Sequence, residues 1–373
     1  MPEATITVEA LRGLIERGEP VTVLDVRRAA DRAEWAIPGS IHVDVHDALW
    51  AKDPTALTDL ALPADRPVVT VCGQGRTSLL AAERLRGRGV RALSLEGGMR
   101  AWSLAWNTAE VPLPDRAIRI IQVRRTGKGC LSYLVGSDGV AAVIDAALPP
   151  ELYLDLARAS GWTITHVLDT HVHADHLSRT RLLAELAGAT LYLPATNRVS
   201  YAHTPLRDGD ALQLGGARLE AVHTPGHTDE STCYLLGSQA LVSGDTLFLG
   251  AVGRPDLEAS PDGARGRARA LHRSLQRVLA FPPETLILPG HTSEPVAFDG
   301  RPIAAPLAAV RQQLEIVQAS EDSFVETILA RIPPTPPNHH RIVQLNEAGL
   351  FPEDDPTILE AGANRCAVSA PAA

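Results

Sequence analysis

Three histidines and one aspartate lie within the six residues from His171 to His176, directly after an apolar run typical of a strand. Such groups converge in a protein when they coordinate a metal ion or neutralise one another. Because alternate residues of an extended chain point the same way, His171, His173 and Asp175 share one side, and His176 follows them. Imidazole and carboxylate are common ligands of zinc and iron, so this run predicts a metal centre.

Three later segments supply further candidate ligands, and each of them also follows an apolar run. They contribute His223, Asp245 and His291, whereas His227 is expected to shape the turn after His223 rather than to bind metal. Four strand ends that each offer an imidazole or a carboxylate strengthen the prediction of a metal site. The alternative, histidines scattered over surface loops, does not account for so tight a cluster.

A second candidate site surrounds Cys72, at the end of the apolar run 68–71. Gly73 and Gly75 allow the following loop to turn its backbone N–H groups inward, and a helix is expected to begin near Ser78. Inward N–H groups and a helix N-terminus stabilise negative charge on sulfur, so Cys72 is predicted to be a reactive thiol. The alternative is a buried core cysteine in a tight turn.

Two patterns of elements must position these groups. Residues 1–107 alternate apolar strands, at 21–26, 67–71 and 90–95, with helical stretches at 8–17, 78–86 and 99–106. Strands that alternate with helices predict an α/β unit with a mostly parallel sheet. Residues 108–116, which contain two prolines, are expected to form a linker.

The pattern from 117 to 300 begins with three strands in hairpins, at 118–123, 131–136 and 140–144, and then alternates strands with helices. This order predicts two sheets covered by helices, an αββα sandwich. Residues 301–373 are mostly helical in pattern and are expected to form a C-terminal extension. Its helices could cover a homodimer interface.

The composition, 45% hydrophobic and 21% charged over 373 residues, is ordinary for globular domains. Four cysteines without a C-x-x-C pair exclude a disulfide scaffold; Cys130 and Cys233 are expected in strand cores, and no role is assigned to Cys366. The net charge of −9 opposes binding to nucleic acid or anionic lipid. The charged first twenty residues do not form a signal peptide, and no apolar run approaches the ~18 residues of a membrane span. A cytoplasmic protein with free thiols is therefore expected, with no nucleic-acid or membrane partner.

Residues 1–107 resemble a rhodanese domain, a sulfurtransferase module. The matching motifs are Asp25-Val26-Arg27, Glu34-Trp35, Ile37-Pro38-Gly39-Ser40-Ile41, the loop Cys72–Thr77, and Leu95-Glu96-Gly97-Gly98-Met99-Arg100-Ala101-Trp102. The resemblance implies that Cys72 carries a persulfide intermediate. The loop has Gly73 and Thr77 where the family often has basic residues, so Arg76 is its remaining cation for an anionic substrate.

Residues 117–300 resemble the metallo-β-lactamase superfold. Its seven ligand positions fall on His171, His173, Asp175, His176, His223, Asp245 and His291. The stretch Gly253-Arg254-Pro255-Asp256-Leu257 is similar to the "G-R-x-D" of persulfide dioxygenases fused to rhodanese domains, and 333–341 and 359–366 look like the tail of that group. The match implies one Fe(II) on His171, His223 and Asp245, with the other four groups around it.

The resemblance also implies a reaction. A persulfide of a small thiol, with glutathione as the family's usual carrier, reacts with O2 to give sulfite, and thiosulfate or sulfite serves the rhodanese half. Arg254 would anchor an acidic carrier, or alternatively form a structural salt bridge with Asp256. The main rival is a zinc thioester hydrolase similar to glyoxalase II, with two zinc ions held by all seven ligands. A third interpretation is a sulfide or persulfide sensor that uses Cys72 as a redox switch.

Overall fold

The N-terminal domain is built on a five-stranded sheet with the strand order β1-β5-β4-β2-β3, in which every neighbouring pair is parallel. The computed structural model describes residues 4–369 of the chain. The strands are β1 (Thr5–Ile6), β2 (Thr22–Asp25), β3 (Ile41–His42), β4 (Val68–Val71) and β5 (Ala92–Leu95). The helices are α1 (Val8–Glu16), α2 (Ala29–Glu34), α3 (His46–Trp50), α4 (Arg76–Gly87) and α5 (Gly98–Trp102). The predicted α/β unit with a mostly parallel sheet is confirmed.

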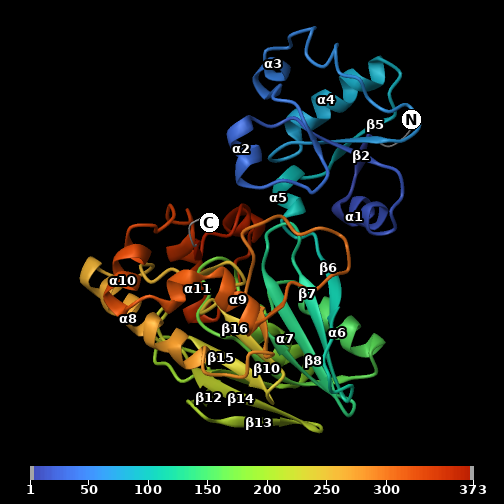
Figure 1. Cartoon of the computed structure of the whole chain (residues 1–373). Helices are drawn as coiled ribbons and strands as arrows, with labels where there is room; N and C mark the ends of the chain where they lie inside the picture. Colours follow the sequence, from blue (N-terminus) through green and yellow to red (C-terminus); the bar gives the residue numbers. More distant parts are fainter. Residues whose placement is uncertain (1–3, 370–373) are drawn as a thin grey trace.

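Two sheets form the second domain, which lies below the first in Figure 1. The first sheet has the order β12-β11-β10-β9-β8-β7-β6, and the second has the order β13-β14-β15-β16-β18-β19. The first sheet consists of β6 (Asn107–Val111), β7 (Ile118–Arg124), β8 (Leu131–Ser137), β9 (Val140–Ile144), β10 (Thr163–Leu168), β11 (Thr190–Pro194) and β12 (Thr204–Leu206). The second consists of β13 (Ala211–Leu214), β14 (Ala217–His223), β15 (Thr232–Leu236), β16 (Ala240–Gly244), β18 (Leu286–Pro289) and β19 (Ala305–Pro306).

Apolar side chains that alternate along the strands fill the space between these sheets, among them Ile120, Tyr133, Leu219 and Tyr234. The outer face of the first sheet packs on α6 (Pro150–Ala159) and α7 (Thr180–Ala187). The outer face of the second packs on α8 (Pro261–Val278), α9 (Leu307–Gln313) and α10 (Glu321–Leu329). The predicted αββα sandwich is therefore confirmed.

The predicted linker 108–116 is wrong over its first half. Residues Asn107–Val111 form β6, which pairs antiparallel with β7 at the edge of the first sheet. The segment alternates buried and more exposed residues, the pattern of a half-buried strand, and Pro112 follows directly after its end. The prolines mark where the strand stops, not where a flexible connection begins.

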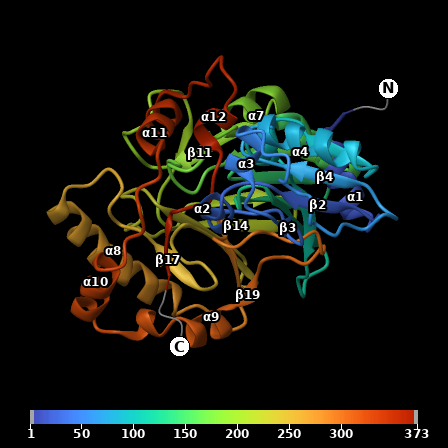
Figure 2. The same cartoon turned by 90° about the horizontal axis from the view of Figure 1, so that it is seen from above.

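The C-terminal extension is mostly helical, as predicted, but it is integrated into the sandwich. Besides α9 and α10 it contains a 3-10 helix (Glu315–Gln318), α11 (His339–Ala348) and α12 (Thr357–Glu360). Its first strand, β19, joins the edge of the second sheet, and β20 (Ala367–Ser369) pairs with β17 (Ala251–Gly253). In Figure 2, viewed from above, α12 lies next to the N-terminal domain, and it contacts α5.

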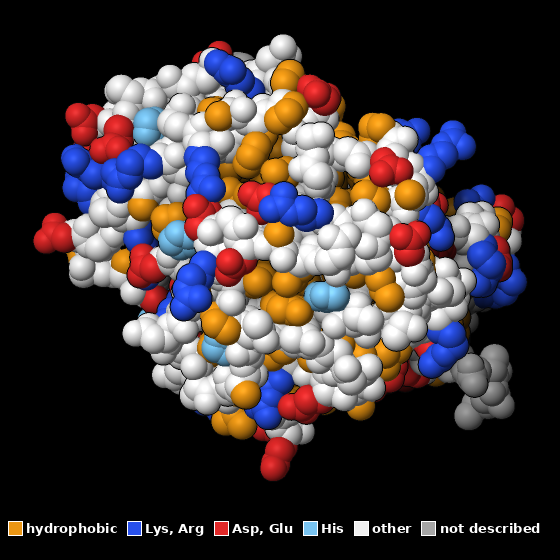
Figure 3. All heavy atoms as spheres, turned by 90° about the horizontal axis from the view of Figure 1, so that it is seen from below, with side chains coloured by type: hydrophobic (Ala, Val, Ile, Leu, Met, Phe, Trp, Pro, Cys, Tyr) orange, Lys and Arg blue, Asp and Glu red, His pale blue; other side chains and the backbone are white. Residues whose placement is uncertain are grey.

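On the face opposite the N-terminal domain, shown in Figure 3, basic and acidic side chains lie side by side among uncharged atoms. Neither sign of charge dominates that face. Among residues 4–369, no helix combines the length and the apolar character needed to cross a membrane.

Candidate metal centre and Cys72 loop

The candidate ligands gather where strand ends of the two sheets meet. His171 follows β10 of the first sheet, whereas Asp245 and His291 follow β16 and β18, a parallel pair of the second sheet. A Cβ atom at Gly290 would lie 2.6 Å from Asp245 Oδ1, so only glycine lets these two strand ends approach so closely. The sheet topology thus brings together groups that lie more than a hundred residues apart.

Two imidazoles and one carboxylate form the compact centre of this cluster: His171, His227 and Asp245, with ligand atoms within 4.8 Å of one another. The Nε2 atoms of His227 and His171 lie 3.5 Å and 3.9 Å from Asp245 Oδ2. All three side chains are buried. Imidazole and carboxylate groups at this spacing fit the ligands of a metal ion.

Hydrogen bonds on the far side of each ring fix these imidazoles. His227 Nδ1 donates to the carbonyl oxygen of Arg254 at 2.8 Å. Thr170 donates its hydroxyl hydrogen to Asp145, so its oxygen accepts a hydrogen bond from His171 Nδ1 at 2.9 Å. Burial, reinforced by neighbouring charge, holds the pKa of His171 well below its ordinary value. Both rings therefore present Nε2 lone pairs to the centre of the cluster.

Several buried polar atoms at this point have no hydrogen-bond partner among the described residues. They are His171 Nε2, His176 Nε2, Asp245 Oδ2, and both ring nitrogens of His291. An unpaired buried polar atom costs about 1–3 kcal/mol, so a concentration of them is unfavourable unless a bound group satisfies them. These unpaired atoms all belong to imidazole or carboxylate groups, which are suitable ligands for a divalent metal ion.

The structure does not bring His223 into this cluster, which corrects the prediction. Its side chain is exposed, and its Nε2 lies 3.0 Å from the carbonyl oxygen of Asp229. The chain turns back at Gly226, where a Cβ atom would lie 2.4 Å from Leu271 of α8. This tight packing directs His227 inward, so His227 takes the position that the sequence analysis assigned to His223. The alternation of side chains along β14 gave no reason to exclude His223, because His223 lies on the same side of the strand as the buried Ala221.

His173 is buried beside the centre but turned away from it. Its Nε2 lies 3.2 Å from Asp145 and 3.6 Å from Asp169. Burial opposes a positive charge on this ring, but the two carboxylates outweigh it and raise the pKa of His173 well above its ordinary value. His173 therefore acts here as the partner of a carboxylate pair rather than as a member of the three-residue centre.

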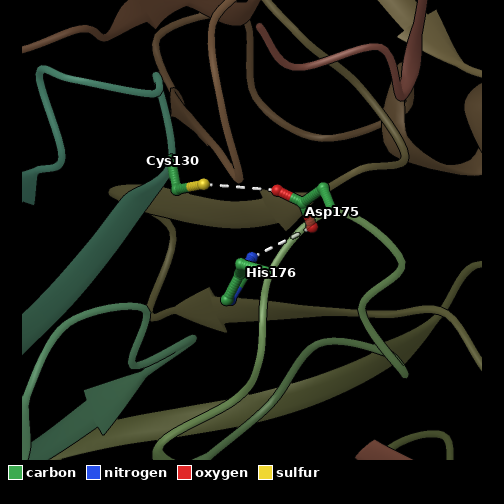
Figure 4. A group of neighbouring side chains, drawn as sticks. All are labelled: Cys130, Asp175 and His176. Atoms are coloured by element: carbon green, nitrogen blue, oxygen red, sulfur yellow. Dashed lines mark hydrogen bonds and ion pairs between the residues drawn. The ribbon is translucent and has the colours of Figure 1, made fainter. Parts of the chain in front are cut away.

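Asp175 and His176 form a neighbouring group with Cys130, shown in Figure 4. His176 Nδ1 lies 2.9 Å from Asp175 Oδ1, and the Cys130 thiol donates to Asp175 Oδ2 at 3.2 Å. Burial raises the pKa of Cys130 well above its ordinary value, so this thiol is protonated and can donate. Cys130 is more than the strand-core residue that the sequence predicted, because its thiol contacts a candidate ligand.

Two residues of the C-terminal segment complete the surroundings, and the sequence analysis gave neither of them a role. Asn364 Nδ2 donates to Asp175 at 2.8 Å. The Cys366 thiol lies with Asp245 and His291 in a group whose ligand atoms are within 4.8 Å of one another. Cys233, by contrast, is buried in the core of the second sheet, as predicted.

Arg254 is not free to bind a substrate, which corrects the anchoring role. Its side chain is completely buried, and it binds both carboxylate oxygens of Asp256 at 2.8 Å. Its Nη1 donates to the carbonyl oxygens of Pro334 and Arg365. The structure therefore shows the alternative, a salt bridge with Asp256. Arg254 also joins the C-terminal segment to the loops around the metal centre.

The Cys72 loop connects β4 to α4, which begins at Arg76, two residues before the predicted start, and the Cys72 side chain is buried. Cys72 Sγ accepts hydrogen bonds from the N–H of Gly75 at 3.1 Å and from the hydroxyl of Ser78 at 3.3 Å. These donors stabilise negative charge on the sulfur. Arg76 is the first residue of α4 and is exposed, and Gly75 before it has a φ of 86°, which favours glycine.

Comparison with known proteins agrees with the two domains. A model described as "Metallo-beta-lactamase superfamily" matches residues 125–291, and one described as "Rhodanese-like domain" matches residues 7–105. A hydroxyacylglutathione hydrolase of Methylococcus capsulatus is 33% identical over 197 residues, which are 52% of this chain and 73% of that protein. One of Rhodospirillum rubrum is 32% identical over 182 residues, 48% of this chain. The chain spans 63% of the length of that relative, slightly less than two thirds.

Two solved structures are similar over the same region. ETHE1 from Myxococcus xanthus has a TM-score of 0.54 and 29% identity, covering 62% of this chain and 99% of that one. A metallo-beta-lactamase from Staphylococcus aureus has a TM-score of 0.58 and 27% identity, covering 63% of this chain and 74% of that one. With this fold, this set of strand-end ligands and these matches, the chain belongs to the metallo-beta-lactamase superfamily and carries a rhodanese-like domain at its N-terminus.

Proposed function

We propose that the second domain is a persulfide dioxygenase, which converts a small thiol persulfide, such as glutathione persulfide, to sulfite and the thiol. The balanced reaction is RSSH + O2 + H2O → RSH + SO3²⁻ + 2 H⁺. The observation that carries the proposal is the compact group of His171, His227 and Asp245, while His173 is turned toward Asp145. Two histidines and one carboxylate with open positions are typical of Fe(II) oxygenases. The similarity to ETHE1 from M. xanthus also supports it.

Fe(II) held by these three residues would supply open coordination positions and the redox chemistry that adds both oxygen atoms of O2 to sulfur. The chain's own residues prepare the site. Arg254 and Thr170 hold the two imidazoles through their Nδ1 atoms, so that both Nε2 atoms face inward. Burial of the whole cluster limits water around the reacting sulfur, and His291 closes one side, 3.2 Å from Asp245.

The first domain would transfer sulfur in the same oxidation state as the outer sulfur of the persulfide substrate. The Cys72 thiolate attacks the outer sulfur of thiosulfate, forms a persulfide, and releases sulfite. The N–H of Gly75 and the hydroxyl of Ser78 are placed to stabilise the negative charge on that sulfur. A thiol then takes the outer sulfur and leaves as a new persulfide, which is the substrate class of the second domain.

The test is to measure iron content, O2 uptake and sulfite release of the purified chain with glutathione persulfide. One iron per chain and one O2 consumed per sulfite formed are expected. Iron-loaded protein that consumes no O2 with this substrate would contradict the proposal.

A second candidate function is thioester hydrolysis, because several of the matched relatives are named hydroxyacylglutathione hydrolase. Two zinc ions would then be held, the second by Asp175, His176 and His291, with hydroxide as the nucleophile. Two zinc ions per chain, rapid hydrolysis of S-lactoylglutathione and no O2 uptake would favour this function over the first.

A further inference from the structure

Two histidines and one glutamate meet at the surface of the second domain, apart from the buried metal centre. His339 and His340 are the first two residues of α11, and Glu258 lies in the loop between β17 and α8. Their candidate ligand atoms, two imidazole nitrogens and one carboxylate oxygen, lie within 4.8 Å of one another. Imidazole and carboxylate are common ligands of zinc, so this group has the chemistry of a second metal site.

The ring of His339 is held with its Nε2 atom toward the carboxylate. The side chain is buried, and its Nδ1 donates a hydrogen bond to the carbonyl oxygen of Pro336 at 2.9 Å. A hydrogen on Nδ1 leaves the lone pair of the neutral ring on Nε2. That atom faces Glu258 Oε1 at 3.7 Å, beyond hydrogen-bond distance, so two acceptors point at each other. A cation between the two atoms would replace this repulsion by attraction.

The distance between the two acceptors fits a shared metal ion. Zinc binds imidazole nitrogen at about 2.0–2.1 Å and carboxylate oxygen at about 2.0–2.2 Å, so two tetrahedral ligands lie about 3.4 Å apart. The 3.7 Å between His339 Nε2 and Glu258 Oε1 is close to that value. His340 Nδ1 contacts the same carboxylate oxygen, and the His340 side chain is 71% exposed. An ion at this position would therefore have three protein ligands and access to water for a fourth.

Other contacts fix the two segments that carry these ligands. Arg254 Nη1 donates to the carbonyl oxygen of Pro334, which joins the loop after β17 to the segment before α11. Leu257, next to Glu258, packs in the same apolar cluster as Val343 of α11. Asn338 Nδ2, just before α11, donates to the carbonyl oxygen of a residue in α12 at 3.0 Å. The ligands are thus placed in advance, which lowers the entropy cost of binding an ion.

The backbone of Glu258 agrees with a binding role. Its φ is 58°, in the left-handed region that residues other than glycine seldom adopt. Such conformations persist where the surrounding structure imposes them, and they are frequent at binding sites. At Glu258 this conformation accompanies a carboxylate that faces both imidazoles.

We propose that Glu258, His339 and His340 form a second metal site, which binds one zinc ion with water as the fourth ligand. The ion links the loop after β17 to the beginning of α11. Imidazole ligands favour zinc over magnesium or calcium, which prefer oxygen ligands alone. The site is separate from the centre at His171, His227 and Asp245, and it does not depend on the reaction proposed for that centre.

The test is an equilibrium titration of zinc on the full chain, after the buried metal centre has been filled. Competition with a chromophoric chelator gives the number of further zinc ions bound and their affinity. His340→Ala and Glu258→Gln each remove one proposed ligand. His46→Ala is the matched control, because His46 also contacts a carboxylate, Asp47 at 3.0 Å, but lies in the other domain.

The unaltered chain and His46→Ala are each expected to bind one zinc ion more than His340→Ala or Glu258→Gln. Loss of an outer partner of a ligand already costs about 10–100-fold in affinity, so loss of a ligand should cost at least about a hundredfold. An equal zinc count and affinity in the unaltered chain and His340→Ala would overturn the proposal. The count is a difference between chains, so it decides this site even if the buried centre proves to have another function.

Thermal unfolding gives a second readout. An ion that binds the folded chain raises Tm, so added zinc should raise Tm of the unaltered chain and of His46→Ala. It should leave Tm of His340→Ala nearly unchanged. Because the His340 side chain is mostly exposed, replacing it should change Tm little before zinc is added. An equal zinc-dependent rise in all three chains would overturn the proposal.

Discussion

Asn364 donates a hydrogen bond of 2.8 Å to Asp175 Oδ2, joining a residue near the C-terminus to the histidine-rich run 189 positions earlier. Asp175 also accepts from the Cys130 thiol and pairs with His176. The C-terminal extension therefore helps to build the candidate metal centre, and the same segment, through Gly362, lines a cavity beside the Cys72 loop. One short stretch of chain thus contacts both candidate sites.

Replacing Asn364 should weaken metal binding without unfolding the protein. Asn364→Ala removes a donor that holds Asp175 beside the three proposed iron ligands, so iron affinity should fall, by less than the about 10–100-fold that loss of a ligand's own orienting partner costs. Iron affinity, measured by competition with a chelator, checks this. Asn197→Ala, at an exposed loop position, is the control and should not change the affinity. Equal affinities of the two variants would show that Asp175 does not depend on Asn364.

His223 and His227 provide a matched pair of variants, because the sequence assigned the ligand role to His223 and the structure assigns it to His227. His227→Ala removes an imidazole whose Nε2 faces Asp245 at 3.5 Å, so metal content and O2 uptake should fall by about a hundredfold or more. His223→Ala changes an exposed side chain four residues away and should leave both near the level of the unaltered chain. Elemental analysis and an oxygen electrode measure the two. If His223→Ala loses the metal while His227→Ala keeps it, the assignment drawn from the structure is wrong.

Removing the charge of Glu360 should destabilise the fold. Glu360→Gln leaves Arg125 and Arg179 buried without a counter-charge, and breaking a buried pair in this way costs about 3–5 kcal/mol. Urea unfolding followed by tryptophan fluorescence measures the loss. Glu326→Gln, at an exposed pair with Arg265, is the control and is expected to leave the unfolding midpoint almost unchanged. Similar midpoints for the two variants would contradict a stabilising role of Glu360.

The Glu360 carboxylate should also make the unfolding free energy depend on pH. Burial alone would raise the pKa of Glu360, but the charges of Arg125 and Arg179 outweigh it and lower this pKa well below its ordinary value. The folded state thus favours the ionised form, so the stabilisation is complete above about pH 4.5 and is lost as the pH falls toward the folded-state pKa. The difference in unfolding free energy between the unaltered chain and Glu360→Gln should therefore shrink on acidification. A difference in unfolding free energy that grows as the pH falls would contradict this prediction.

The two candidate sites should be separable by mutation. Cys72→Ser is expected to abolish sulfur transfer from thiosulfate and to keep O2 uptake with added glutathione persulfide. His171→Ala is expected to do the reverse, because its ring lies in the metal cluster of the other domain. Each variant is the control for the other. Full sulfur transfer by Cys72→Ser would refute its role, and loss of both activities in either variant would argue that the sites are not independent.

Local sequence determined much of the fold. The apolar runs before Cys72 and His171 became β4 and β10, and the glycines after Cys72 produced a loop whose donors reach its sulfur. These features depend on residues close together in the chain, where strand propensity and glycine conformations act directly. The strand Asn107–Val111 was missed because the nearby prolines are a stronger turn signal than a short alternating pattern.

The tertiary structure alone decided which groups face one another. His223 and His227 are four residues apart and chemically identical. The turn at Gly226, which packs closely on Leu271 of α8, and the hydrogen bond from His227 to Arg254 place His227 in the cluster. Arg254 has the chemistry of a substrate anchor, but Asp256 and the C-terminal segment take up its guanidinium. Residue types and their spacing predicted a candidate metal centre and a candidate reactive thiol. Contacts between distant segments selected the members of each site, because burial and partner distance are properties of the folded chain.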